Sequence, residues 1–311
     1  MAPSLLTLSP SRSIIGPLIC ALAAFALIGA APGGQGTYGS PQEAVDALVA
    51  SLRSGVTGDI VRVLGPDGRR LASSGDAVAD TAARERFLTA YDEGHEIRQT
   101  GEGPTILYLG QDDFPFPIPL VYTAGKWWFD TEQGAEEILD RRIGENELAT
   151  IEVMKAFVDA QREYAEADRD GKGAQYARRL LSSDGQKDGL YWPTAEDEPE
   201  SPFGPLVGEA RAEGYSRKRQ GRTPYHGYLF RVLTEQGKDA PGGARPYIVR
   251  GRMIGGFALL AEPAEYGSSG VKTFVVNQDG VVYEKDLGPR TPRLAENMIA
   301  YDPDSTWQRA D

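Results

Sequence analysis

Apolar residues three or four positions apart predict an amphipathic helix over 41–54, near the start of the chain. Ser40 and Glu43 form a capping box around Pro41, and Gly55 is a natural helix end. Two further helices follow before the pattern changes to the alternation that is typical of strands. The expected elements are helices over 59–64 and 80–91, strands over 105–109, 118–123 and 126–130, and a closing helix over 132–142.

A second apolar stripe predicts one long helix over 146–169, about 35 Å in length, and then a short helix over 176–181. Residues 182–224 are rich in Gly and Pro, and a loop region of this length in a compact domain is usually functional or mobile. β-branched and aromatic residues dominate the remainder of the chain. They predict strands over 225–233, 247–250, 253–260, 273–276 and 281–284.

These elements predict an α+β protein with two domains, over 37–143 and 144–311. The first, a capped helix followed by a hairpin-rich sheet, resembles the cone of the nuclear transport factor two-like fold. The second, a long helix and an antiparallel sheet, resembles the globular part of pilins and pseudopilins. Its helix follows a whole domain and carries charges such as Glu147 and Lys155, so it does not suit the hydrophobic stalk of a filament.

Residues 1–36 have the pattern of a secretory signal peptide with a linker. Arg12 is their one charged residue, an apolar run covers 14–31, and small residues close that run. The alternative is an uncleaved anchor, because the run just reaches membrane-spanning length. Cys20 falls inside the run, so the mature chain has no cysteine, which suits an oxidising compartment. We expect a periplasmic or secreted protein that touches the membrane only through this segment, if it is uncleaved.

Composition narrows the chemistry and the partners. Lys and Arg number 33 against 45 Asp and Glu, a net charge of −12, which argues against nucleic acid as a general partner. One Cys and two His exclude Cys-rich zinc sites and multi-His metal centres. No Walker loop, zinc-binding helix motif or nucleophile elbow occurs in the sequence. We therefore favour a binding module over an enzyme and expect no cofactor.

The strongest sign of an ion site is Asp168-x-Asp170, with Gly173 six positions into the loop. This spacing resembles the first half of a calcium-binding loop. Lys172 stands at the fifth position, and Arg179 stands at the twelfth, where a bidentate Glu is needed. We expect a solvated turn at the end of a helix, with calcium on Asp168 and Asp170 as the alternative.

The candidate binding residues lie in two loops and at one histidine. Asp112 and Asp113 precede Phe116 in the Pro-rich segment 111–119, which is either the rim of a cleft or a rigid connection whose aromatic rings cover the core. Trp192 lies in the long loop region. His226, between two tyrosines, is either a ligand-binding or acid–base residue or a packed side chain. A basic cluster that suits an anionic polymer or lipid comprises Arg211, Arg217, Lys218, Arg219 and Arg222.

Several strings along the chain together resemble one bacterial family, the domain of unknown function 2950 family. They are Ser73-Ser74-Gly75-Asp76, Asp113-Phe114-Pro115-Phe116-Pro117-Ile118-Pro119, Arg141-Arg142-Ile143-Gly144-Glu145-Asn146-Glu147, Asp188-Gly189-Leu190-Tyr191-Trp192-Pro193, Pro224-Tyr225-His226-Gly227-Tyr228 and Gly280-Val281-Val282-Tyr283-Glu284-Lys285-Asp286-Leu287-Gly288-Pro289. The resemblance covers nearly all of the mature chain. It implies an exported envelope protein and no particular activity.

The function expected from the sequence is that of an exported, non-catalytic binding or assembly protein of the bacterial cell envelope. Its partner would be another envelope protein, bound through the 182–224 region or the Pro-rich segment. One alternative is an envelope-polymer hydrolase with carboxylates such as Asp112, Asp113 and Asp188 held at a fixed separation. Another is a small-ligand carrier, which needs an apolar cavity in the first domain.

Overall fold

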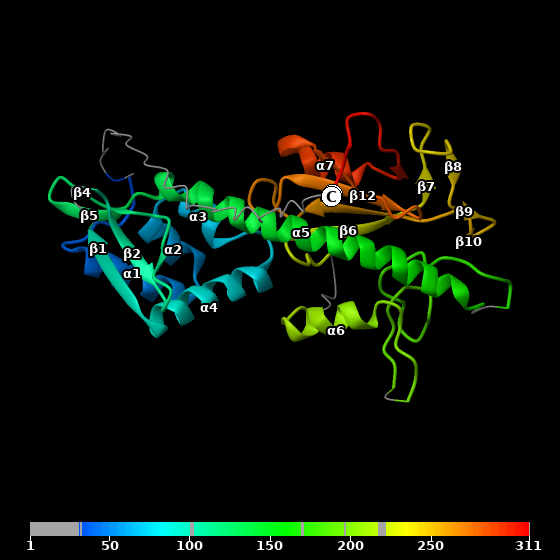
Figure 1. The fold of residues 1–311 in the computed structure, drawn as a ribbon, viewed down its shortest axis with the longest axis horizontal. Coiled ribbons are helices and arrows are strands. Elements are labelled where there is room, and N and C mark those ends of the chain that lie inside the picture. Colours follow the sequence, from blue (N-terminus) through cyan, green and yellow to red (C-terminus); the bar gives the residue numbers. More distant parts are fainter. Residues whose placement is uncertain are drawn as a thin grey trace, which may run out of the picture.

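The computed structural model describes residues 31, 33–99, 103–168, 171–195, 197–216 and 222–310. The protein is α+β, with helices packed on antiparallel sheets (Figure 1). Most of the expected signal peptide, including Cys20, lies outside the described residues. Within the described ranges, no helix is both long enough and apolar enough to cross a membrane.

The N-terminal half packs helices on a small antiparallel sheet with the strand order β1-β2-β4-β5 and with β3 paired to β2. The first helix begins and ends as its sequence predicts: the Ser40 Oγ accepts a hydrogen bond from the Glu43 N–H at 3.1 Å, and Gly55 has a φ of 67°. One apolar core fills the space between helices and sheet. The elements are α1 (Pro41–Ser54), α2 (Thr57–Leu64), α3 (Gly68–Ala72), α4 (Ala77–Glu93), β1 (His95–Gln99), β2 (Thr105–Leu109), β3 (Phe114–Pro115), β4 (Leu120–Thr123) and β5 (Lys126–Phe129).

The C-terminal half is built on an antiparallel sheet with the order β15-β13-β12-β11-β6, so β6 is an edge strand. A second core lies between this sheet and its helices. A small sheet of order β14-β7-β8 and the pair β9–β10 lie beside it. The elements are α6 (Gly204–Ala212), β6 (Tyr228–Leu233), β7 (Glu235–Gln236), β8 (Arg245–Pro246), β9 (Ile248–Val249), β10 (Arg252–Met253), β11 (Ala258–Pro263), β12 (Lys272–Asn277), β13 (Tyr283–Asp286), η1 (Gly288–Arg290), α7 (Thr291–Glu296), β14 (Ala300–Tyr301) and β15 (Gln308–Arg309).

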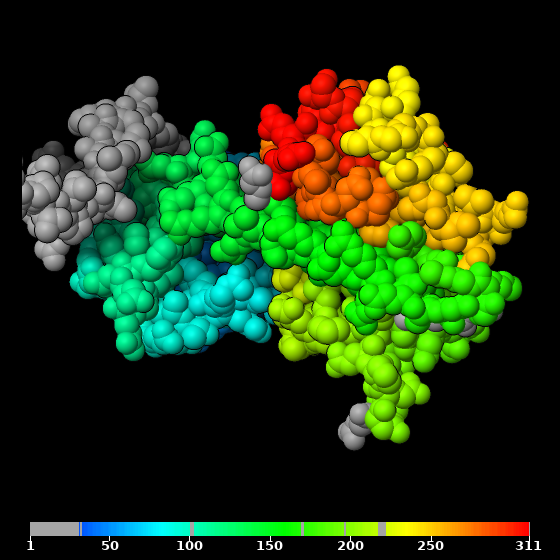
Figure 2. All heavy atoms as spheres, turned by 45° about the vertical axis from the view of Figure 1, so that its right-hand side comes forward, coloured from blue at the N-terminus to red at the C-terminus, as the bar shows by residue number. Residues whose placement is uncertain are grey.

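A single helix, α5 (Thr131–Glu166), joins the two halves. Two helices, over 132–142 and 146–169, were expected here, and that interpretation was wrong: 36 residues run without a break through Gly144. A glycine inside a helix costs only about 1 kcal/mol, and packing on the flanking turns offsets that cost. Figure 2 shows α5 crossing the molecule from the N-terminal half to the C-terminal half.

One expectation for the region after α5 was also wrong. The residues over 176–181 form no helix, because their backbone groups bond to distant segments instead: the Tyr176 N–H donates to the Met253 carbonyl at 2.8 Å. The described residues of the 182–224 region are mostly loop, as expected, and they also contain α6, with Pro205 in its first turn. Proline fits that position because its missing N–H has no partner there in any helix.

Asp76 ties the two halves together across a buried polar junction. Its Oδ1 accepts hydrogen bonds from the backbone N–H groups of Val78 and Ala79, both at 3.2 Å, and so caps α4. Its Oδ2 accepts from the Tyr215 hydroxyl and from the Gly227 N–H, both at 2.9 Å, in the other half. One carboxylate therefore holds the start of a helix and two distant loops.

Candidate functional site: an arginine-lined groove

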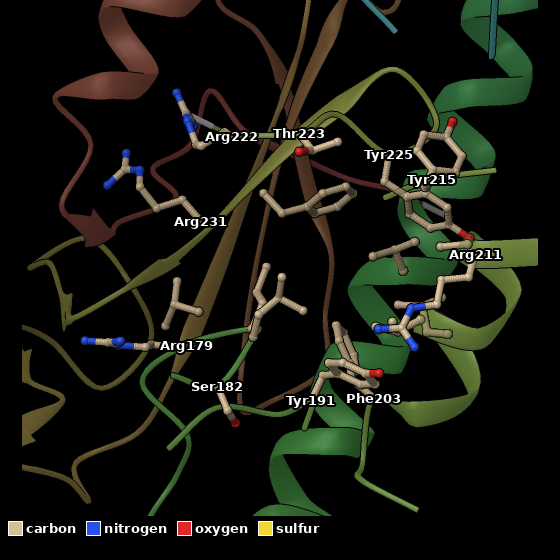
Figure 3. Close-up of a pocket in the computed structure, with 18 of the residues that line it drawn as sticks. Arg179, Ser182, Tyr191, Phe203, Arg211, Tyr215, Arg222, Thr223, Tyr225 and Arg231 are labelled. Atoms are coloured by element: carbon tan, nitrogen blue, oxygen red, sulfur yellow. The ribbon is translucent and has the colours of Figure 1, made fainter. Parts of the chain in front are cut away.

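A groove of about 920 Å³ opens in the C-terminal half, between α6, β6 and the loop over 178–185 (Figure 3). This volume lies within the roughly 300–1,000 Å³ of sites that hold small ligands. The lining comes from α5, α6, β6 and β11 and from the two connections on either side of α6. The 182–224 region, expected from its length to be functional or mobile, thus supplies more than half of the residues that line this surface.

The floor of the groove is apolar because β6 is an edge strand. α5 packs on the inner strands β11 and β12. The side chains of Phe230 and Val232 therefore remain partly exposed in the groove, beside Leu259 of β11. α6 supplies Leu206 and Val207 to the lining. An apolar ligand segment would lose water against all of these side chains.

Arginines surround this apolar floor. Among the described residues of the lining, Asp184 is the single acidic one. Arg222 pairs with Glu262 at 2.6 Å, and Arg179 lies 3.6 Å from Asp188. The remaining arginines form no ion pair within the described ranges, so the groove carries positive charge in a protein of net charge −12. The arginines are Arg178, Arg179, Arg211, Arg222 and Arg231.

The arginines reach the groove from different elements and are held in place. Arg179, Arg222 and Arg231 lie on one side and Arg211 on the other (Figure 3). The guanidinium of Arg211 lies 5.1 Å from the ring centroid of Tyr191. That of Arg231 donates to the carbonyl oxygens of Ala295 and Met298. Burial lowers the pKa of Arg231, yet an arginine keeps its charge in proteins.

Aromatic residues close one end of the groove. The rings of Tyr215 and Tyr225 meet edge to face at 5.0 Å. Tyr225 and Tyr228 exchange two backbone hydrogen bonds around His226 and Gly227, whose φ angles are 47° and 72°. Positive φ at both central residues defines a type I′ turn, which glycine favours and histidine tolerates. Burial and the Asp76 carboxylate raise the pKa of the Tyr215 hydroxyl.

His226 stands beside this end of the groove rather than in its lining. Its ring lies 4.0 Å from that of Tyr225, and its Nε2 is 3.8 Å from the Glu213 Oε2. Together with Arg211 and Arg222 of the expected basic cluster, it is a predicted binding residue that the structure places at or beside the groove.

The Pro-rich segment lies in the other half. Phe116 is buried against the rings of Phe87 and Phe129. Asp112 and Asp113 are exposed between β2 and β3, where Asp113 accepts a hydrogen bond from Arg98 at 2.8 Å. The segment therefore covers the first core and pairs with β2, as a rigid connection would.

Trp192 also lies in a core. It is 7% exposed, and its ring meets that of Tyr164 edge to face at 6.3 Å. Asp188, a carboxylate named for the hydrolase alternative, accepts hydrogen bonds from the Ser183 N–H at 2.7 Å and from the Ser183 hydroxyl at 3.0 Å. It belongs to the C-terminal half, whereas Asp112 and Asp113 belong to the N-terminal half.

The suggested calcium loop is described only in part. Asp168 accepts a hydrogen bond from the Lys172 N–H at 3.0 Å, as in a turn that ends a helix, and Asp170 lies outside the described residues. Elsewhere in the described ranges, no group of three His, Cys, Asp or Glu side chains could hold a metal ion. Of the basic cluster, Arg211 and Arg222 line the groove, while residues 217–219 are also outside the description.

Sequence reasoning missed Phe230, Arg178 and Arg231 as groove residues. Phe230 and Arg231 were read as ordinary strand positions, and the edge position of β6 depends on long-range pairing. The sequence did contain one sign of them: arginines mixed with apolar residues both before and after the 182–224 region.

The structure thus defines an α+β protein with an open, arginine-lined apolar groove in its C-terminal half. Residues 35–310 match the family described as Protein of unknown function (DUF2950), so the chain belongs to that family, as its sequence strings indicated. No curated protein and no solved structure matches the chain.

Three of the strings that carry this resemblance meet at the junction between the halves. Asp76, in the string over 73–76, binds the N–H of Gly227, in the string over 224–228. The string over 141–147 contributes Asn146, which donates to the Ser269 carbonyl at 2.8 Å and packs against Gly227, where a Cβ would lie 2.5 Å from the Asn146 Nδ2. Strings far apart in the sequence thus build one contact surface, next to the closed end of the groove.

Proposed function

We propose that this protein is a non-catalytic binding protein of the bacterial cell envelope, and that another envelope protein occupies the groove. The observation that carries the proposal is the groove itself, which combines an apolar floor with five arginines, of which Arg178, Arg211 and Arg231 form no ion pair within the described residues. A partner segment with apolar and acidic side chains would bury the first and pair with the second.

Export is part of the proposal. It is supported by the apolar run over 14–31, by the single positive charge before that run and by the lack of cysteine in the chain beyond it. The purified mature protein is expected to lack the apolar run, which intact-mass measurement of its N-terminus tests. A full-length mass in the membrane fraction would favour the anchored alternative.

The finer architecture is also proposed. A cone of the nuclear transport factor two-like type over 37–143 is supported by α1–α4 and their antiparallel sheet. A pilin-like arrangement over 144–311 is supported by the packing of the long α5 on β11 and β12. The apolar hollow of the first half, at about 130 Å³, is smaller than the sites that usually hold ligands, so it gives the carrier alternative little support.

Site-specific photocrosslinking in cells tests the function. A photoreactive side chain replaces Leu206 or Val207 in the groove wall, and the matched control replaces Leu294, which is 40% exposed on α7 and outside the groove. We expect one envelope protein to crosslink to the groove positions but not to Leu294. An Arg211→Glu change should weaken this crosslink, because it reverses a charge that faces the partner.

Equal crosslinking from all three positions would contradict the proposal. So would the same yield with and without Arg211→Glu. A protein partner in the groove would also be ruled out if neither Leu206 nor Val207 gave a crosslinked protein, as is expected of Leu294.

A further inference from the structure

The open edge of β6 is the part of the groove whose chemistry can be read most closely. In the antiparallel pair of β6 and β11, Tyr228 lies opposite Pro263, Phe230 opposite Ala261, and Val232 opposite Leu259. Tyr228 exchanges both of its backbone hydrogen bonds with Tyr225, at 2.9 and 3.0 Å. Its N–H and C=O therefore point away from β11.

Backbone groups alternate in direction along an antiparallel strand, so those of Phe230 and Val232 point the same way as those of Tyr228. Hydrogen bonds at both ends of β6 confirm this alternation. The Thr234 carbonyl accepts from the Tyr247 N–H at 2.9 Å on the outer side, and the Gly227 carbonyl accepts from the Ala264 N–H at 2.8 Å on the inner side. No side chain or loop of the described residues bonds to the outward groups of Phe230 and Val232.

The side chains along this edge also alternate: apolar ones lie on one face of the sheet and arginines on the other. Phe230 and Val232 face the groove on the side of α5. Arg231, at the rim of the groove, points toward the other face of the sheet, where it bonds to the end of α7, and Arg222 reaches from the rim to Glu262 on that face. The Arg222 side chain remains 43% exposed, so it has donors left for a further acceptor.

We propose that an extended peptide segment with alternating apolar and acidic residues adds to the edge of β6 as a further strand. Its backbone bonds to the N–H and C=O groups of Phe230 and Val232. Its apolar side chains enter the groove, and its acidic side chains lie over Arg222 and Arg231. Strand addition to an open edge is an established mode of peptide recognition. This inference rests on the proposed function and specifies the partner's binding segment.

Direct peptide binding to the full chain tests the alternation. The probe is a fluorescent form of acetyl-Val-Glu-Val-Glu-Val-Glu-Val-amide, measured by anisotropy. Two controls keep its length: one groups the valines and glutamates in separate blocks, and the other replaces each Glu with Lys. We expect the alternating acidic peptide to bind at least about tenfold more tightly than either control, because only it satisfies the strand period and the charge.

Backbone changes on each side test strand addition itself. Val232→Pro removes only an outward N–H, which leaves the ladder between β6 and β11 intact, and Val232→Ala is the matched control for the lost side chain. We expect Val232→Pro to bind the peptide about fivefold more weakly than Val232→Ala. In the unaltered protein, the peptide should slow amide hydrogen exchange at Phe230 and Val232. An added strand turns the N–H groups of every second residue toward β6. N-methylation of that set of alternate peptide residues should abolish binding, and N-methylation of the other set should not.

The outcomes separate this inference from the function on which it rests. Strand addition would be overturned if the alternating and block peptides bound equally, or if the two N-methylated peptides bound equally. Either result would count even if the groove crosslinks to a protein. Binding of phosphatidylglycerol vesicles at the groove, with no binding of the acidic peptide, would overturn it in favour of a lipid. If Val232→Pro fails to fold, the N-methylated peptides and the exchange measurement still decide.

Discussion

Phe114 and Phe116 stand two positions apart, but their environments differ. Phe116 is 9% exposed and packs in the first core, whereas Phe114 is 44% exposed, with the Arg141 guanidinium 5.0 Å from its ring centroid. We expect Phe116→Ala to lower the free energy of unfolding by about 3–5 kcal/mol and Phe114→Ala by less than about 1 kcal/mol. Urea unfolding measures both. Similar losses for the two variants would contradict this assignment.

Asp188 gives one wall of the groove a pH dependence. Hydrogen bonds from Ser183, first of all its N–H, hold the pKa of the Asp188 carboxyl below its ordinary value. A depressed pKa means that this carboxylate stabilises the fold above the unfolded-state pKa of about 3.9, and that its contribution is lost as the pH falls through the folded pKa. An NMR titration should place its midpoint below 3.9. Asp188→Asn should remove this dependence.

The candidate binding residues show that local sequence patterns do not predict whether a single side chain is buried or exposed. Phe116 and Trp192 stand beside prolines in apparent loops, yet both are buried. Burial depends on partners such as Phe87 and Tyr164, which lie far away along the chain. The same applies to Arg231, whose place beside the groove follows from the edge position of β6.

At the scale of elements, α5 contains a matched pair of glycines. A Cβ at Gly144 would meet no atom within 4 Å, whereas a Cβ at Gly134 would lie 2.7 Å from the Ile118 Cα and closer still to the Pro117 carbonyl. We expect Gly144→Ala to raise the free energy of unfolding by about 0.5–1 kcal/mol, because alanine loses less backbone entropy in a helix.

Gly134→Ala should do the opposite, because backbone atoms cannot yield as a flexible side chain can. Thermal unfolding of the two variants, which carry the same substitution in the same helix, measures the difference in sign. A stabilising Gly134→Ala would show that the contact between α5 and the segment before β4 is looser than described.

Local patterns predicted the elements whose signals are local. α1 has its cap and its stripe, and the β4–β5 hairpin has alternating residues around its turn, so both were expected within a few residues of their observed bounds. The continuity of α5 was missed because Gly144 resembles a helix end, although packing on both cores carries the helix through it. The residues over 176–181 have helical composition but bond to distant strands.

At the scale of the whole molecule, the halves share more than α5. Ser268 Oγ lies 3.0 Å from the Arg70 carbonyl and 3.2 Å from the Ser73 carbonyl, and Asn146 donates to the Ser269 carbonyl at 2.8 Å. Tyr215 belongs both to the groove and to the junction, because its hydroxyl bonds to Asp76. A ligand against this ring would therefore contact the residue that links the two halves.

This arrangement predicts that the halves unfold together as long as Asp76 is intact. Asp76→Ala removes the cap of α4 and leaves the buried groups of Tyr215 and Gly227 without their acceptor, for a loss of about 2–4 kcal/mol. Because these bonds cross the junction, scanning calorimetry should show one transition for the unaltered protein and two for Asp76→Ala. Ser40→Ala is the control, since it removes a cap within one half and should shift a single transition. A single, merely shifted transition for Asp76→Ala would mean that α5 and the Ser268 hydrogen bonds couple the two cores without Asp76.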